Sequence, residues 1–248
     1  MSTVRLDKLL ANLGYGSRRE VQALARAGRI RLDGEPVRDA EGRIPLTPDL
    51  QTRLTVSNKA LDPLPGLALM MHKPVGVTCS HKEDAELVYD LLPNRWRLRE
   101  PAISTVGRLD KDTSGLLLTD DGALLHRIIS PKSQLAKRYR AVLARPLVGD
   151  EAALFASGEM MLEGETKPLL PAELMIVDPH TAELTITEGR YHQVRRMFAA
   201  VGNHVAALHR HRIGGLALPD DLEPGAYRIM GQAELGALFT TKDTKSTK

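Results

Sequence analysis

The residues best suited to chemistry lie in the stretch Gly107–Gly122, where an apolar segment leads into Arg108 and Asp110 and a polar turn then precedes Leu116–Thr119. A carboxylate at the end of a strand, two residues from an arginine, can be held ionised beside positive charge. An ionised carboxylate of this kind can serve as a nucleophile. The same residue types would equally form a structural turn, so composition alone leaves both interpretations open.

Three other kinds of chemistry are less well supported. The remaining aspartates of this stretch are interpreted as turn and capping residues. His209 and His211 would share one face of a strand, as zinc ligands can. Arginines crowd the same region, however, and disfavour a cation, so we expect no metal site. The single cysteine, Cys79, excludes an internal disulfide and fits a reducing compartment.

Basic residues are unevenly distributed along the 248-residue chain, whose formal net charge is only +3. The first 60 residues hold 11 Lys and Arg against 7 Asp and Glu. Two later segments, Ala123–Gly149 and Gly189–Pro219, contain bases and no acid. Phosphates attract Lys and Arg along a track, so three basic segments indicate a long anionic ligand. The alternative is solvated charge that is balanced in space by acids elsewhere.

The elements that must position these residues begin with a small α/β module. Leucines recur at helical spacing from Leu6 to Leu13. Ser17 and Glu20 predict a capping box at the start of a second helix. A short strand, Ile30–Leu32, runs into Asp33-Gly34, a strong hairpin signal. The basic first turn of the second helix opposes the usual preference for acids there, and an anionic partner would explain it.

This module resembles the S4 RNA-binding domain over about residues 3–50. The resemblance rests on Arg5-Leu6-Asp7-Lys8, Ser17-Arg18-Arg19, Gly28-Arg29-Ile30 and Asp33-Gly34. It implies that RNA is contacted by six residues: Arg5, Lys8, Ser17, Arg18, Arg19 and Arg29.

We expect three regions: an S4-like module with its linker over 1–60, a catalytic domain over 61–239 and a disordered tail over 240–248. The predicted class is α+β, with a mixed, largely antiparallel sheet in the second domain, because strands there follow one another without intervening helices. The predicted strands are Leu67–His72, Ile103–Leu109, Leu116–Thr119, Arg138–Leu143, Ala172–Val177, Glu183–Thr187, Val205–Ile213 and Tyr227–Ile229. The predicted helices are Ala123–Ile129, Asp150–Ala156, His192–Val201 and Ala233–Phe239.

The second domain resembles the pseudouridine synthases of the RsuA/RluB/RluE/RluF type. Four stretches carry the resemblance, in family order: Lys73-Pro74-Val75-Gly76, the stretch around Asp110, Lys137-Arg138-Tyr139, and Glu188–Phe198 with its continuation from Leu208 to Gly215. The resemblance implies an isomerase that detaches uracil from its ribose, rotates it and rejoins it through C5. Because the product is an isomer, no cofactor is expected.

The resemblance also implies residue roles. Asp110 would be the catalytic aspartate, because an anionic oxygen suits a sugar carbon that becomes electron-poor. Arg195 would grip that carboxylate with two hydrogen bonds, and Tyr139 would stack on the target base. Arg108 would fill the gap left by the flipped nucleotide, and Leu208 would line the uracil pocket. Further substrate contacts are expected from four residues: Lys73, Arg190, His192 and Gln193.

Within the family, Gly189–Val194 points to the branch that modifies 16S ribosomal RNA of the small subunit, free or in an assembly intermediate. We expect a cytoplasmic monomer without a membrane segment. Two alternatives stay open: the same activity on 23S ribosomal RNA, or a ribosome-assembly protein that binds RNA without catalysis. The second is favoured only by a departure from the family pattern, one apolar residue fewer after Gly115, which would reverse side-chain facing along that strand.

Overall fold

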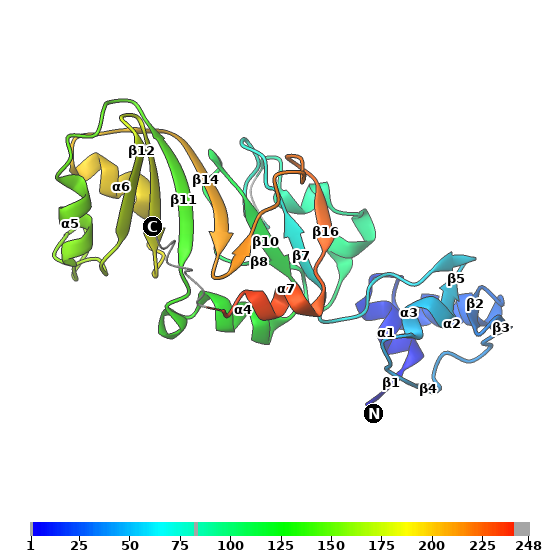
Figure 1. The fold of residues 1–248 in the computed structure, drawn as a ribbon. Coiled ribbons are helices and arrows are strands. Elements are labelled where there is room, and N and C mark those ends of the chain that lie inside the picture. Colours follow the sequence, from blue (N-terminus) through cyan, green and yellow to red (C-terminus); the bar gives the residue numbers. More distant parts are fainter. Residues whose placement is uncertain (1, 82–83, 241–248) are drawn as a thin grey trace. The chain divides into compact units, whose positions relative to one another are not determined.

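The computed structural model describes residues 2–81 and 84–240, and the chain folds into two compact units (Figure 1). The first unit holds the residues up to Ala68 together with Tyr89–Ser104 and Thr119–Ala123. The second holds Leu69–Val88, Thr105–Leu118 and the residues from Leu124 onward. The predicted boundary at residue 60 stays a prediction. Residues 241–248 of the predicted tail lie outside the described residues.

The first unit begins with a small module of short helices and strands. Its elements are β1 (Thr3–Arg5), α1 (Leu6–Asn12), α2 (Arg18–Arg26), β2 (Ile30–Leu32), β3 (Glu35–Pro36), β4 (Arg43–Pro45), α3 (Leu50–Arg53), β5 (Leu54–Val56) and β6 (Lys59–Ala60). The sheet order is β3-β2-β5-β6, with β1 and β4 paired separately. The leucines predicted to form one helix face are all buried in the common core.

Local sequence explains two of these elements directly. The Ser17 side chain accepts from the Glu20 amide, and the Glu20 carboxylate accepts from the Ser17 amide, so the predicted capping box is confirmed. Asp33 and Gly34 both have positive φ, 54° and 85°, which is the geometry of a tight hairpin turn between β2 and β3. Both predictions succeeded because they depend only on neighbouring residues.

Two ion pairs hold the later parts of the first unit, one to the segment after β6 and one to each other. Arg95 donates to Asp62 at 2.6 and 3.0 Å and lies 4.2 Å from the centroid of the Tyr15 ring. Arg99 and Asp120 form a second pair at 2.6 Å, with both side chains 1% exposed. A buried pair of this kind depends on both partners, because removal of one leaves an uncompensated charge.

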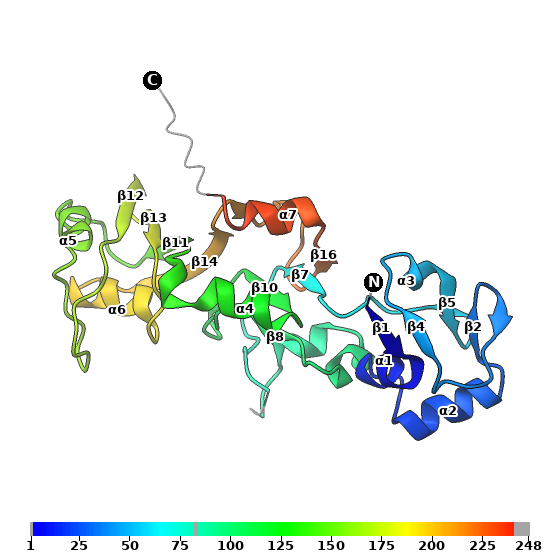
Figure 2. The same ribbon diagram turned by 90° about the horizontal axis from the view of Figure 1, so that it is seen from below.

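The second unit is built on two sheets, seen from two sides in Figures 1 and 2. The first has the order β16-β7-β10-β8, and the second has the order β12-β13-β11-β14-β15 with β9 beside β14. Their strands are β7 (Ala68–Met71), β8 (Ser104–Thr105), β9 (Thr113–Ser114), β10 (Leu116–Thr119), β11 (Lys137–Leu143), β12 (Glu173–Asp178), β13 (Thr181–Ile186), β14 (Val205–Ile213), β15 (Leu216–Ala217) and β16 (Tyr227–Ile229).

Antiparallel pairing dominates the larger sheet, and only β9 runs parallel to its neighbour β14, so the predicted mixed sheet is confirmed. The helices of this part of the chain are α4 (Gly122–Ile129), α5 (Glu151–Ser157), α6 (Gln193–Ala200) and α7 (Gln232–Ala237). Single 3-10 turns occur at Val88–Leu91, Asn94–Leu98 and Pro131–Ser133. No helix among the described residues combines the length and apolar composition needed to cross a membrane.

One predicted strand was wrong in extent. In place of Ile103–Leu109, only β8 is extended, because Gly107 takes a φ of 70° and the chain turns before Asp110. The strand after Gly115, which has one apolar residue fewer than the family pattern, forms as β10. The predicted reversal of its side chains falls on residues 116–118, whose side chains lie outside the described part of the structure. Gly115, at φ 85°, absorbs the turn before it, and a Cβ there would overlap the carbonyl oxygen of Arg210.

Candidate active site

A cavity of about 590 Å³ lies in the second unit, between the Gly107–Thr113 loop, one face of β11 and β14, and the start of α6. Pockets of 300–1,000 Å³ are usual for small ligands, so a nucleoside would fit. Side-chain alternation along β11 turns Lys137 and Tyr139 to this face. The predicted site residues that line the cavity are Arg108, Asp110, Tyr139, Arg190, His192, Gln193 and Leu208.

Asp110 is held between two basic side chains from the His192–Arg195 segment. Its Oδ1 lies 3.2 Å from His192 Nε2, and its Oδ2 lies 3.6 Å from Arg195 Nε. The carboxylate side chain is 26% exposed and therefore reachable from the cavity. Asp110 also accepts the Thr113 amide at its main-chain oxygen, which closes the turn that carries it.

The predicted two-bond grip of Arg195 on Asp110 is corrected by the geometry. The terminal nitrogens of Arg195 donate instead to the main-chain oxygens of Val205 at 2.8 Å and Asp112 at 3.0 Å. Only Nε faces the carboxylate, at a distance beyond a normal hydrogen bond. Arg195 therefore ties β14 to the Gly107–Thr113 loop and supplies positive charge to Asp110 from one side.

Lys73, a predicted substrate contact, has its ammonium bound by the protein itself. Its side chain is fully buried, and its Nζ donates to the main-chain oxygens of Pro74, Lys111 and Thr113 at 3.0, 3.1 and 2.8 Å. An ammonium has three donors, so none is left for a ligand. Burial lowers the pKa of Lys73. Lys73 fixes the loop on both sides of Asp112, close to Asp110.

His192 begins α6 in a left-handed conformation, with a φ of 49°. Its ring stacks on Tyr191 at 3.8 Å between centroids while Nε2 reaches Asp110. A left-handed, non-glycine residue is strained and persists only where its surroundings hold it. His192 was predicted as a substrate contact, and the structure places it directly on the aspartate.

Arg190 and Gln193 support the loop before α6. Arg190 donates to Glu188 and Glu165, each at 3.1 Å, and to the main-chain oxygens of residues 167 and 168. Gln193, 4% exposed, accepts the Arg190 amide and donates to Glu188. Their polar groups are thus engaged by the protein, although both residues also line the cavity, and their contact with substrate stays a prediction.

Tyr139 and Leu208 form an apolar part of the cavity wall and are 7% and 4% exposed. Arg108 is exposed at the same cavity. These placements agree with the contacts that the resemblance implies. Tyr139 is also a mostly buried sheet residue, as its place in a strand predicts, so the two descriptions of this residue are compatible.

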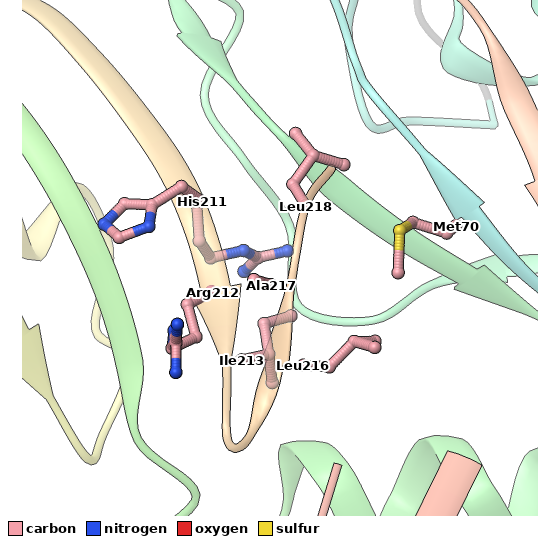
Figure 3. Close-up of a pocket in the computed structure, with 8 residues that line it drawn as sticks. Met70, His211, Arg212, Ile213, Leu216, Ala217 and Leu218 are labelled. Atoms are coloured by element: carbon pink, nitrogen blue, oxygen red, sulfur yellow. The ribbon is translucent and has the colours of Figure 1, made fainter. Parts of the chain in front are cut away.

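Two cations in the cavity were missed as site residues, although both fall in stretches that carried the resemblance. Lys137 pairs with Ile186 and Ile213 in the sheet, and Arg210 lies directly across from Tyr139. Burial, together with the nearby Arg210, lowers the pKa of Lys137 to about 8. Arg210 is 3% exposed and also lines a much smaller cavity of about 20 Å³. Figure 3 labels other residues that line this cavity, among them Met70 and Leu216 of β15. The sequence did offer a signal for Lys137: it lies two positions before Tyr139, so in a strand both side chains face the same side.

His209 and His211 of β14 lie on the opposite face of the same sheet. His72, His209 and His211 line a separate cavity of about 530 Å³ with Arg140 and Glu183. Each ring has a partner: His72 at a main-chain oxygen, His209 at Ser114 and His211 at Glu183, all at 2.7 Å. Within residues 2–81 and 84–240, no group of three or more His, Cys, Asp or Glu is arranged to hold a metal ion.

The residues predicted to bind RNA in the first unit divide into two kinds. Lys8, Arg18, Arg19 and Arg29 have exposed side chains. Arg5 instead forms a two-bond pair with Asp7, at 3.0 and 2.7 Å, and Ser17 is engaged in its capping box. The pair lowers the pKa of Asp7. These two residues thus have structural roles that the predicted contact did not include.

The fold and the site define an enzyme that modifies RNA. The RNA pseudouridylate synthase family matches residues 68–200, and the S4 domain matches residues 4–44. The chain belongs to the RNA pseudouridylate synthase family and is an RNA pseudouridine synthase that carries an S4 domain, as the sequence predicts.

Individual relatives cover nearly the whole chain. Ribosomal small subunit pseudouridine synthase A of Yersinia pestis is 42% identical over 95% of this chain and 98% of its own, and its namesake in Escherichia coli K12 is 41% identical over 95% and 100%. An uncharacterized RNA pseudouridine synthase of Bacillus subtilis, YtzG, is 42% identical over 95% and 98%. A solved pseudouridylate synthase is similar with a TM-score of 0.66 and 37% identity, over 95% of this chain and 99% of the other.

Proposed function

We propose that this protein converts a specific uridine of small-subunit ribosomal RNA to pseudouridine, with Asp110 as the catalytic residue. The observation that carries the proposal is the ion-paired carboxylate of Asp110, partly exposed in a cavity large enough for a nucleoside. The names of the relatives from Yersinia pestis and Escherichia coli support the small subunit as the source of the target.

The reaction exchanges one bond for another within the nucleotide. The bond between C1′ of ribose and N1 of uracil breaks, the base rotates, and C1′ bonds to C5. The proton on C5 leaves and N1 takes up a proton, so the product is an isomer and no outside group is consumed. The anionic oxygen of Asp110 faces the sugar carbon when that carbon is electron-poor.

The other cavity residues hold the flipped nucleotide during these steps. The ring of Tyr139 stacks on the base, an interaction worth about 1–3 kcal/mol per base. Leu208 packs against the apolar part of the pocket, and Arg108 at the mouth fills the space that the base vacates in the RNA. Flipping a base costs a few kcal/mol, so both contacts help to offset that cost. Arg195 and His192 keep the Asp110 carboxylate oriented.

The basic S4 domain holds the RNA while the catalytic domain acts on one nucleotide. Lys8, Arg18, Arg19 and Arg29 contact phosphates, since exposed bases of this kind bind the RNA backbone. We include in the proposal that the enzyme acts as a monomer in the cytoplasm. Size-exclusion chromatography with light scattering tests the monomer.

The test is carbodiimide and reverse-transcription mapping of pseudouridine in both ribosomal RNAs of a deletion strain. We expect one modification of the small-subunit RNA to disappear, to return with the wild-type gene, and to stay absent with Asp110→Asn. The matched control is Asp112→Asn, because the Asp112 side chain is exposed and only its main-chain oxygen is used by Arg195.

Each outcome is informative. If the modification that disappears lies in the large-subunit RNA, the proposed target is wrong and the proposed pseudouridine synthase activity is supported. A deletion profile identical to wild type in both RNAs, or full rescue by Asp110→Asn, would contradict the proposed function and favour RNA binding without catalysis.

A further inference from the structure

Two cations and the predicted stacking tyrosine share one face of the larger sheet. Lys137 and Tyr139 are two residues apart on β11, so both side chains point to the same side. Arg210 on β14 is the direct cross-strand partner of Tyr139. All three line the cavity that contains Asp110. A planar base stacked on Tyr139 would therefore have positive charge at its edges.

Among the described residues, no carboxylate forms an ion pair with either cation. Arg210 donates to the main-chain oxygens of Val106 at 3.1 Å and Gly107 at 3.5 Å, and its buried Nε has no hydrogen-bond partner within that part of the chain. Lys137 donates to the main-chain oxygen of Leu135, at 3.2 Å. Neither cation therefore has a direct carboxylate partner among these residues, and the attraction of Glu188 for Lys137 is smaller than the opposing effects of burial and Arg210.

Two adjacent, poorly solvated cations are unfavourable for folding alone. The low pKa of Lys137 reflects this, because burial and Arg210 both oppose its charged form. Such unfavourable groups gather at functional sites, where a ligand completes them. Asp110 is already flanked by His192 and Arg195. Glu188 accepts hydrogen bonds from Arg190 and Gln193. A bound ligand is therefore the favoured source of further negative charge beside Lys137 and Arg210.

The chemistry of uridine isomerisation supplies that charge. When the bond between C1′ and N1 breaks, its electron pair stays on the base and spreads onto the two carbonyl oxygens, O2 and O4. Preorganised donors aimed at developing negative charge are among the strongest catalytic devices in enzymes. Cytosine, by contrast, carries an amino group at position 4, and that donor would face a cation.

We propose that Lys137 and Arg210 bind the carbonyl oxygens of the flipped uracil, stabilise its negative charge when it detaches, and select uracil against cytosine. This inference rests on the proposed function. Both side chains keep their protons throughout: the base carries the electron pair away from C1′, returns it through C5, and exchanges the C5 proton for one on N1.

The main test measures the single-turnover rate constant and the RNA dissociation constant of the full-length protein on a transcript that contains the target uridine. We expect Lys137→Met to lower the rate by about 100-fold, a usual effect of losing one such donor, with RNA affinity within about threefold of wild type. Lys137→Arg keeps the charge and should recover most of the rate. Arg140→Met is the matched control, because Arg140 lies on the same strand but lines the cavity on the opposite face.

A second measurement separates this inference from the proposed function. Equilibrium dialysis compares uridine and cytidine 5′-monophosphate, where we expect wild type to prefer the uridine nucleotide by about tenfold or more and Lys137→Met to lose that preference. Arg210→Lys keeps a charge at the buried position and should retain the preference.

The outcomes divide cleanly. One outcome is a wild type that is inactive on ribosomal RNA yet prefers the uridine nucleotide in a way that depends on Lys137. That result would overturn the proposed substrate and support the uracil site. An active wild type whose rate is unchanged by Lys137→Met, or is lowered equally by Arg140→Met, would overturn the inference and keep the function. A loss seen only in RNA affinity would also overturn it.

Discussion

Replacing Lys73 by methionine should destabilise the protein and slow catalysis, because the Lys73 ammonium holds three main-chain oxygens beside Asp110. The substitution keeps the length and apolar volume of the side chain and removes the ammonium. Three main-chain oxygens then lose their donor, and the one on Thr113 is fully buried, whereas those on Pro74 and Lys111 are partly buried. The loop next to Asp110 loses the group that ties it to β7.

The magnitude follows from how well each oxygen can be resolvated. A buried acceptor left without a partner costs about 1–3 kcal/mol, and a partly buried one that can reach water costs roughly 0.5–1 kcal/mol. The burial penalty of the lysine charge, visible in its lowered pKa, is relieved and offsets part of this. We expect a net loss of about 2–4 kcal/mol in the free energy of unfolding. A loop displaced by an ångström can cost about 100-fold in rate.

Urea unfolding followed by far-ultraviolet circular dichroism measures the first quantity, and single-turnover kinetics on the target transcript measures the second. Lys132→Met is the control, because Lys132 is exposed. An unfolding free energy within about 0.5 kcal/mol of wild type, together with an unchanged rate constant, would refute the conclusion that the Lys73 ammonium holds the catalytic loop.

Three further predictions concern parts of the molecule away from the cavity. Asp120→Ala leaves Arg99 buried without its carboxylate, so urea unfolding should show a loss of about 3–5 kcal/mol, and a loss below about 1 kcal/mol would contradict that role. Burial lowers the pKa of His209 from 6.5 to about 4, so the unfolded state takes up a proton first as pH falls. The stability that the neutral ring contributes is fully present above pH 6.5 and declines between pH 6.5 and about 4. His209→Gln should reduce that decline in the free energy of unfolding by about 1–2 kcal/mol, after allowance for partial exposure. The double substitution of Arg18 and Arg19 by alanine should weaken RNA binding and reduce the slope of log affinity against log salt by up to about 0.7 per lost phosphate contact, and an unchanged slope would exclude both residues from the RNA contact.

Much of the secondary structure could be predicted because its signals are local. The Asp33-Gly34 turn and the Ser17–Glu20 capping box involve residues no more than three apart. Strands β14 and β16 have their predicted bounds, because apolar alternation and flanking turns define them. The strand ending at Leu109 was predicted too long, since its apolar residues continue into a buried loop that turns at Gly107.

The candidate site was only partly predictable. Asp110, Tyr139 and Leu208 were identified through the family resemblance, and all three line one cavity. Lys73 and Arg190 occupy family motifs too, but they hold main-chain oxygens and carboxylates of the protein itself. A motif records that a residue type is required at a position, and it does not distinguish a substrate contact from a structural one.

The amino-acid sequence by itself determined the order of the S4 and synthase domains and many local elements, because these depend on spacing along the chain. Only the tertiary structure decided which charges meet. Asp110 meets His192 and Arg195, which lie more than 80 residues later in the chain, while Arg210 and Lys137 come together without an ion-paired carboxylate among the described residues. Electrostatic interactions depend on distance and burial in space, and the folding of β11 against β14 sets both.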